Sequence, residues 1–180
     1  YNYILDEYTS QKLGNNPIKG SIGSAETKSK YDTRFRYYKE AENKEIENSL
    51  LYINSDTIIN NLREVSISII PQRKIHKYEL SVTDTIYFES LLANNAIVND
   101  GKPFSIKKGT FLVYHMGNSD ESLELKFVLK PDSKTTININ EISYDLLENS
   151  MFKLQPRTED MMPMPFVSND AIMCIQKLKL

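Results

Sequence analysis

From residue 62 onward, apolar and polar side chains alternate with a period of two. Val65, Ile67 and Ile69 alternate with serines until Pro71 ends the run, and the alternation recurs at residues 78–82, 123–129 and 137–140. Successive side chains of a β-strand point to opposite faces, so this pattern predicts strands with one face on a core. The predicted core residues are Val65, Ile67, Ile69, Leu80, Val82, Leu112, Leu123, Leu125, Phe127, Ile137 and Ile139.

Three further segments have strand-like patterns of other kinds. Residues 110–116 are more continuously apolar, which predicts a central strand. Asn99-Asp100-Gly101 separates two short apolar runs, 96–98 and 104–106, and predicts a hairpin turn between them. The closing run, residues 171–180, is apolar on both faces at 172–175, so we expect a largely buried strand there.

The first 61 residues lack this regular alternation. Residues 1–30 are polar and rich in turn-forming residues, which predicts an irregular arm, although alternation at residues 1–5 allows an edge strand. Within residues 31–61, a short helix capped by Asp32 or Thr33 would carry an apolar stripe. That stripe comprises Phe35, Tyr38 and Ala41, extended by Ile46, Leu50 and Leu51.

Short strands at turn-separated spacing, without long helices between them, predict a mainly all-β fold. We expect an antiparallel β-sandwich of about seven to nine strands, with an irregular N-terminal arm and room for one short helix. A length of 180 residues favours one domain overall. Residues 1–61 would form the arm and helix packed on the sandwich, and residues 62–180 the sandwich itself.

Charge and composition exclude several classes of protein. With 22 basic and 24 acidic residues, the net charge of −2 argues against a nucleic-acid binder, which would carry a basic stripe. No apolar run approaches the ~18–20 residues of a membrane-spanning helix. The single cysteine, Cys174, rules out an internal disulfide. The chain opens at Tyr1 without a signal-type segment, so we expect it to be a piece of a longer protein.

No familiar catalytic or metal-binding motif is present in the sequence. His76 and His115 have no partner at metal-ligand spacing, and Cys174 lies between apolar neighbours, as a buried thiol would. Nucleophile-elbow and glycine-rich phosphate motifs are absent from the sequence. We therefore expect no catalytic, cofactor-binding or metal-binding residue in this chain.

Three weaker alternatives remain open at this point. Two of the 24 carboxylates could act as a glycosidase pair, but the sequence does not give their separation. Tyr87, Phe88 and Tyr114 could form a sugar-stacking platform, against the more common role of such residues in core and cross-strand pairs. The methionines of residues 161–164 could hold Cu(I), or simply fill gaps under a loop.

Short segments along nearly the whole chain resemble one known family. These are Tyr3-Ile4-Leu5-Asp6-Glu7-Tyr8-Thr9, the strand 65–71 ending near Arg73, the turn Asn99-Asp100-Gly101, and a closing pattern of Arg157, Met161-Met162-Pro163-Met164-Pro165 and Asn169-Asp170-Ala171-Ile172. Together they resemble the C-terminal extracytoplasmic β-rich domain of membrane-anchored zinc exopeptidases, metallopeptidase family twenty-eight, whose eukaryotic cousin is the endoplasmic reticulum metallopeptidase. In that family the first segment is an opening strand.

The resemblance implies a non-catalytic accessory domain. The family's zinc ligands and acidic general base lie in a preceding peptidase domain, and no position here matches them, so no catalytic residue is carried over and zinc belongs to the parent's peptidase domain. The implied location is the periplasmic face of a bacterial membrane, tethered by upstream helices. The implied partners are the parent's own peptidase and membrane domains. The alternative is a free-standing carbohydrate-binding or protein-interaction sandwich.

Overall fold

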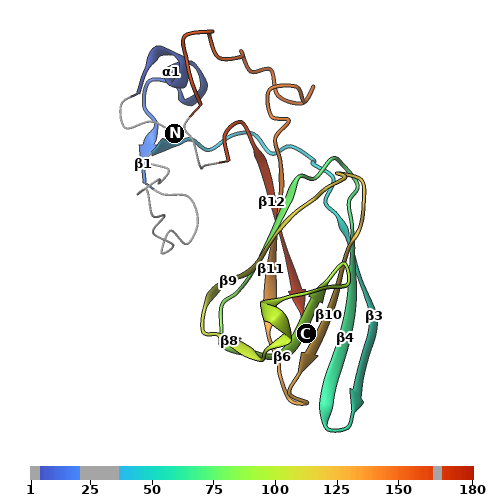
Figure 1. Cartoon of the computed structure of the whole chain (residues 1–180). Coiled ribbons are helices and arrows are strands. Elements are labelled where there is room, and N and C mark those ends of the chain that lie inside the picture. Colours follow the sequence, from blue (N-terminus) through green and yellow to red (C-terminus); the bar gives the residue numbers. More distant parts are fainter. Residues whose placement is uncertain (1–4, 21–36, 164–167) are drawn as a thin grey trace. The chain divides into compact units, whose positions relative to one another are not determined.

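The computed structural model describes residues 5–20, 37–163 and 168–180 (Figure 1). The chain divides into two compact units. The larger comprises Ile46–Tyr144 and Ala171–Leu180, and the smaller comprises Tyr1–Glu45 and Asp145–Asp170.

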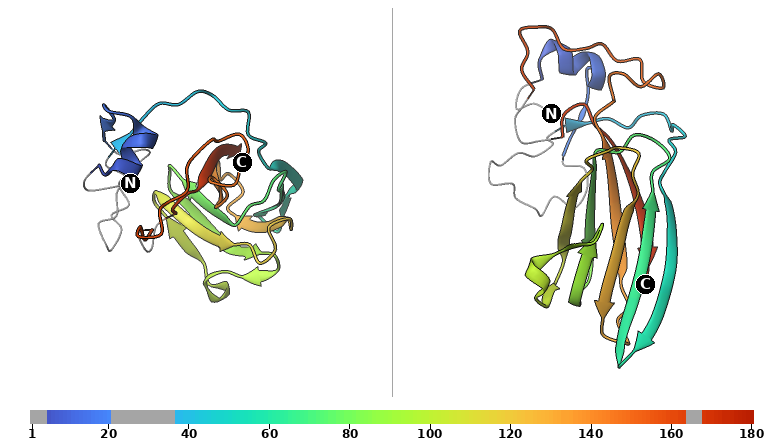
Figure 2. Two further views of the ribbon diagram at one scale, coloured as in Figure 1. Left: turned by 90° about the horizontal axis from the view of Figure 1, so that it is seen from above. Right: turned by 45° about the vertical axis from the view of Figure 1, so that its right-hand side comes forward.

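The larger unit consists of two antiparallel sheets (Figures 1 and 2). The first has the strand order β3-β4-β10-β6-β7, with β8 also paired to β6, and the second has the order β12-β11-β5-β9. This confirms the all-β antiparallel sandwich. The strands are β3 (Leu50–Ile59), β4 (Leu62–Ile70), β5 (Lys77–Val82), β6 (Ile86–Ala93), β7 (Ala96–Ile97), β8 (Phe104–Ile106), β9 (Gly109–His115), β10 (Leu123–Leu129), β11 (Thr136–Ser143) and β12 (Ile172–Lys179).

The core lies between the two sheets, where the alternation predicts it. In the first sheet Leu125 pairs with Ile67, and in the second Ile139 pairs with Leu80, so the apolar rows of neighbouring strands share one face. Every predicted core residue is buried except Leu112, which is partly buried and packs against the core. Phe88 adds an aromatic centre that the alternation did not single out. Its ring contacts those of Phe104, Phe111 and Phe127, at centroid distances of 5.0, 5.1 and 5.8 Å.

The helix expected to carry Tyr38, Ala41, Ile46, Leu50 and Leu51 is wrong, because Tyr38 lies in a short strand and residues 39–49 form neither helix nor strand. Residues 50–59 form β3, which pairs with β4 and places the start of the sandwich before residue 62. A register shift after Ile53 interrupts the period of two, and this hides the strand in the sequence. The proposed helix caps lie outside the described residues.

The hairpin predicted around Asn99-Asp100-Gly101 is also wrong. Strands β7 and β8 do not pair with each other; both pair with β6. The tight turn instead lies between β6 and β7, at Asn94 and Asn95, whose φ angles are 45° and 62°. Asn99–Gly101 forms a short 3₁₀ helix, η1, so a turn does lie between the two predicted runs, but the strands that it connects do not pair.

Strands β9 and β12 are the two edges of the second sheet. The central position expected for β9 is therefore wrong, and its Val113 is half exposed. Strand β12 does pair within the sandwich, with β11, as expected. It is not largely buried, however, because this four-stranded sheet ends at β12 and leaves Met173 and Ile175 exposed.

The smaller unit contains the helix α1 (Glu7–Leu13) and a short two-stranded sheet of β1 (Ile18–Lys19) and β2 (Tyr37–Tyr38). Asp6 caps the helix by accepting a hydrogen bond from the Thr9 backbone N–H at 2.7 Å. The opening strand implied for residues 3–9 is therefore wrong at 7–9, because the cap makes this segment helical. Residues 1–4 of the expected edge strand lie outside the described residues.

Candidate functional site

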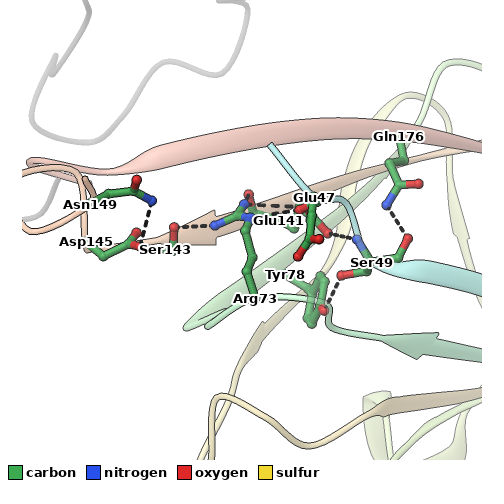
Figure 3. A network of polar contacts seen from close by, with 9 residues as sticks. All are labelled: Glu47, Ser49, Arg73, Tyr78, Glu141, Ser143, Asp145, Asn149 and Gln176. Atoms are coloured by element: carbon green, nitrogen blue, oxygen red, sulfur yellow. Dashed lines mark hydrogen bonds and ion pairs between the residues drawn. The ribbon is translucent and has the colours of Figure 1, made fainter. Parts of the chain in front are cut away.

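At one end of the sandwich, the core-facing rows of side chains become polar. On β11 the row begins with the buried Ile137 and Ile139 and continues with Glu141 and Ser143, both at 0% exposure. Glu141 lies opposite Tyr78 on β5. A carboxylate thus occupies a position that alternation reserves for the core. Figure 3 shows the buried polar cluster built around it, which comprises Ser49, Arg73, Tyr78, Glu141, Ser143 and Gln176.

Glu141 is paired with a positive charge inside the protein. Its Oε1 lies 3.4 Å from Nη2 of Arg73, and its Oε2 accepts the backbone N–H of Ser49 at 2.9 Å. The Arg73 side chain is itself only 12% exposed. A buried carboxylate without such partners would be strongly unfavourable, so the pair and the added hydrogen bond make its burial tolerable.

Arg73 joins three segments of the chain through one guanidinium group. It follows β4, and its Nε donates to the carbonyl oxygen of Glu47 at 3.2 Å. Its Nη1 donates to Oγ of Ser143, and its Nη2 also reaches the Glu141 carbonyl at 3.5 Å. The planar arginine fork suits this role because its five N–H donors point in fixed directions.

Ser49, just before β3 of the first sheet, is held by side chains of the second sheet. Its Oγ lies 2.9 Å from the hydroxyl of Tyr78, and its carbonyl oxygen accepts from Nε2 of Gln176 on β12 at 2.9 Å. Burial is the main reason that the pKa of Tyr78 is raised to about 12, and the hydrogen bond with Ser49 opposes that rise. The phenol therefore stays neutral across the physiological range.

The geometry of this cluster is suited to holding segments together. Glu141 has no exposed surface from which to take or give a proton to a substrate. Cys174, opposite Glu141 on β12, has a thiol pKa raised chiefly by burial, which leaves little of the nucleophilic thiolate. The cluster therefore holds the segment of Glu47 and Ser49 against the second sheet through hydrogen bonds and an ion pair.

The two histidines considered as ligands have separate, local environments. Nδ1 of His76 accepts the backbone N–H of Tyr144 at 3.2 Å, and its ring lies 5.4 Å from that tyrosine's ring. His115 is exposed at the end of the edge strand β9. Across residues 5–20, 37–163 and 168–180, no group of three or more His, Cys, Asp or Glu side chains is arranged to hold a metal ion.

The three aromatic residues considered as a sugar platform do not share a surface. Phe88 is completely buried in the core, and its neighbour Tyr87 faces the other side of β6, with Nζ of Lys130 5.0 Å from its ring centre. Tyr114 packs partly against the core from the other sheet, and its hydroxyl accepts from Nδ2 of Asn94 at 3.1 Å. The core and cross-strand role is therefore the correct one for Phe88 and Tyr114.

The methionine segment is only partly described. Met161 is half-buried and Met162 is 89% exposed, while Met164 lies outside the described residues.

In the smaller unit, residues from the first and last segments of the sequence resemblance come together. Nη1 of Arg157 forms an ion pair with Oδ2 of Asp170, and its guanidinium lies 5.5 Å from the ring centre of Tyr8. The backbone N–H of Leu146 donates to the Asp170 carbonyl at 3.1 Å, so residues 145–170 form a loop closed at its ends. We refer to Tyr8, Arg157 and Asp170 as the closing cluster.

No individual sequence motif marks either cluster. The signal for the first was an acidic residue at the next core position after Ile137 and Ile139, followed by Ser143 at the one after. The signal for the second was the resemblance itself, which marks Tyr8, Arg157 and Asp170 without indicating that they are neighbours.

Comparisons with known proteins identify no relative: no family model, curated protein or solved structure matches this chain. Among the helices in the described part of the chain, none is long and apolar enough to cross a membrane.

Proposed function

We propose that this chain is a non-catalytic accessory domain of a membrane-bound, zinc-dependent exopeptidase of the aminopeptidase type. The observation that carries the proposal is the closing cluster. Tyr8, Arg157 and Asp170 come from the first and last segments of the family resemblance, and they are in contact in the fold. If the opening and closing matches had arisen independently, there would be no reason for them to meet.

The β-rich architecture supports the same proposal, because the family's C-terminal domain is β-rich. In this role, the domain packs on the peptidase or membrane domain of its parent, on the periplasmic side, and restricts access to the zinc site. Zinc and the acidic base are supplied by the peptidase domain of the parent. The chain described here contributes a stable surface, held at one end by the buried polar cluster.

The complete gene that encodes this chain provides the test. Its product, expressed in bacterial membranes, should hydrolyse aminopeptidase substrates and lose that activity when zinc is chelated. The purified 180-residue chain should show no such activity and should retain no stoichiometric zinc after dialysis. A complete product with neither membrane helices nor peptidase activity would refute the proposal.

A free-standing sandwich that binds another protein is the second candidate, favoured by the exposed apolar side chains of strand β3. The carbohydrate-binding version loses its main support, because Phe88 is buried and Tyr87 and Tyr114 lie on different sheets. A glycan array with the purified chain separates the two versions. Saturable sugar binding that is lost in Tyr87→Ala would restore the carbohydrate reading.

A further inference from the structure

Strand β3 is a long sheet edge with one free side. It extends over ten residues and pairs with β4 on one side, and no other described strand pairs with it (Figure 1). The backbone N–H and C=O groups along a free edge can pair with a further strand. This edge is therefore able to extend the sheet.

Both faces of β3 carry exposed apolar side chains. Pairing with β4 puts Leu50, Tyr52 and Ile59 on one face, and Ile53 and Ile58 on the other. All five are exposed, from 44% for Leu50 to 63% for Ile58. Strands that are apolar on both faces are typical of the covered interior of a sheet, so β3 has the side chains of an interior strand at an edge position.

Strand β3 has a register shift after Ile53 but lacks the lysine and proline that often protect a sheet edge. Natural edge strands commonly carry lysine or proline to prevent pairing. Strand β12, an edge of the second sheet, carries Lys177 and Lys179. Strand β3 contains neither residue type, and its one charged side chain is Asp56.

The charge of Asp56 is already neutralised within the chain. Nε and Nη2 of Arg63 donate to its two carboxylate oxygens at 2.7 and 2.5 Å. Such a bidentate pair lowers the pKa of Asp56 and fixes both side chains. Two identical β3 strands could therefore meet without repulsion between their aspartates.

The order of residues along β3 is self-complementary in the antiparallel direction. If residue 50 of one strand lies opposite residue 59 of another, Leu50 meets Ile59 and Leu51 meets Ile58, while Asn54 meets Ser55 at the two-fold axis. This register also brings together residues from the same face, because Tyr52 and its opposite residue Thr57 both lie on the face of Leu50. Isologous contacts require this kind of self-complementarity.

We propose that β3 is a dimerisation edge, at which a second copy of this chain adds its own β3 antiparallel about a two-fold axis to form one continuous sheet across both molecules. The occupant is a second copy because the apolar ends and the polar centre of β3 match their own reversed order, and because Asp56, which would lie opposite Ile53, is already neutralised by Arg63. This inference concerns a surface separate from both clusters, and it does not depend on the proposed function.

Mass measurement in solution provides the first test. The full 180-residue chain should be dimeric at high concentration and dissociate on dilution, as measured by sedimentation or by light scattering after gel filtration. Ile58→Lys should weaken the dimer at least about tenfold. Ile175→Lys is the matched control, because Ile175 is 62% exposed, on the edge strand of the other sheet, and should leave the dimer unchanged. Circular dichroism should show both variants folded.

Cysteine crosslinking tests the register directly. On a Cys174→Ala background, Tyr52→Cys and Thr57→Cys in one chain should give a covalent dimer on mild oxidation. Opposite residues in an antiparallel pair have Cα atoms about 4.5–5.5 Å apart, within reach of a disulfide. Either substitution alone should give almost none, because the identical positions would lie about 17 Å apart along the strand.

Two results would overturn the inference. One is a wild-type chain that stays monomeric at every concentration up to its solubility limit. The other is a dimer that Ile175→Lys dissociates and Ile58→Lys leaves intact, which would place the interface on β12.

Discussion

Two residues at the polar end of the sandwich, Glu141 and Tyr78, should affect the stability of the folded chain measurably. Both occupy core-facing positions and both are fully buried, yet each carries a group that prefers water. Arg73 and Ser49 satisfy these groups. A buried ion pair adds little to stability by comparison with a well-packed apolar pair. Removing one partner is strongly destabilising, however, because the other charge then stays buried without a counter-charge.

Glu141→Gln should lower the free energy of unfolding by about 3–5 kcal/mol, because it removes the negative charge and leaves Arg73 buried without its counter-charge. Urea denaturation measures this change. The matched control is Glu64→Gln, an exposed position on β4, which should shift the free energy of unfolding by less than about 0.5 kcal/mol. Equal effects of the two substitutions would mean that the Arg73–Glu141 pair does not stabilise the folded chain.

Because Tyr78 is buried, we expect the folded chain to lose stability in alkaline solution. Burial raises its pKa in the folded chain to about 12, against about 10 when unfolded. The folded state therefore keeps its proton more tightly. Its contribution is complete below pH 10 and should fall by about 2–3 kcal/mol as the pH rises towards 12. Urea denaturation at several pH values should show this decline in the wild type. Tyr78→Phe should lack this part of the decline, and an identical decline in both would contradict the assignment.

At the level of elements, two pairs of asparagines determine how neighbouring strands turn. Asn60 and Asn61 join β3 to β4 with φ angles of 49° and 62°, as Asn94 and Asn95 join β6 to β7. Two consecutive residues with positive φ make a tight turn that matches the twist of a hairpin, and asparagine tolerates this region better than most residues. Asn94 does more: its side chain accepts the Glu124 N–H at 2.7 Å and donates to Tyr114.

Asn61→Ala should therefore destabilise the chain by about 1–2 kcal/mol, because in the left-handed region the Cβ of alanine comes too close to a backbone carbonyl oxygen. Asn61→Gly should be neutral or slightly stabilising, since glycine reaches this region at no steric cost. Thermal unfolding compares the three proteins. A loss in Asn61→Gly as large as that in Asn61→Ala would show that the asparagine side chain, and not its backbone, matters at this turn.

At the scale of the whole molecule, the chain leaves the sandwich after β11 and returns to it as β12, with residues 145–170 belonging to the smaller unit. The ion pair of Arg157 with Asp170 and the backbone bond from Leu146 to Asp170 close this segment. Joining the ends of a loop lowers its conformational entropy, so removing the closing contact should make the loop more mobile.

Arg157→Ala should make the loop more susceptible to limited proteolysis, with new cleavage sites in residues 146–163 identified by mass spectrometry. The sandwich should keep its unfolding temperature, because the removed contacts lie in the smaller unit. Lys153→Ala, an exposed position in the same loop, is the matched control and should leave the cleavage pattern unchanged. Unaltered cleavage in Arg157→Ala would indicate that Arg157 does not close the loop.

The alternation of apolar and polar residues was enough to establish the β-sandwich and ten of the nineteen buried hydrophobic residues in the described part of the chain. The period of two is a property of the extended backbone, so the local sequence alone shows which side chains share a face. This is why the burial of Val65, Ile67 and Leu125 could be predicted. The same local information failed at β3, where one extra residue after Ile53 breaks the period and conceals the strand.

Only the tertiary structure decided which strands are neighbours and which polar residues meet. Local sequence marks Asn99-Asp100-Gly101 as a turn, but pairing of both flanking strands with β6 depends on long-range contacts. The same holds for Arg73 and Glu141, 68 residues apart, and for the edge positions of β9 and β12. A residue's face follows from its own strand, whereas its partner and its exposure depend on how the whole chain packs.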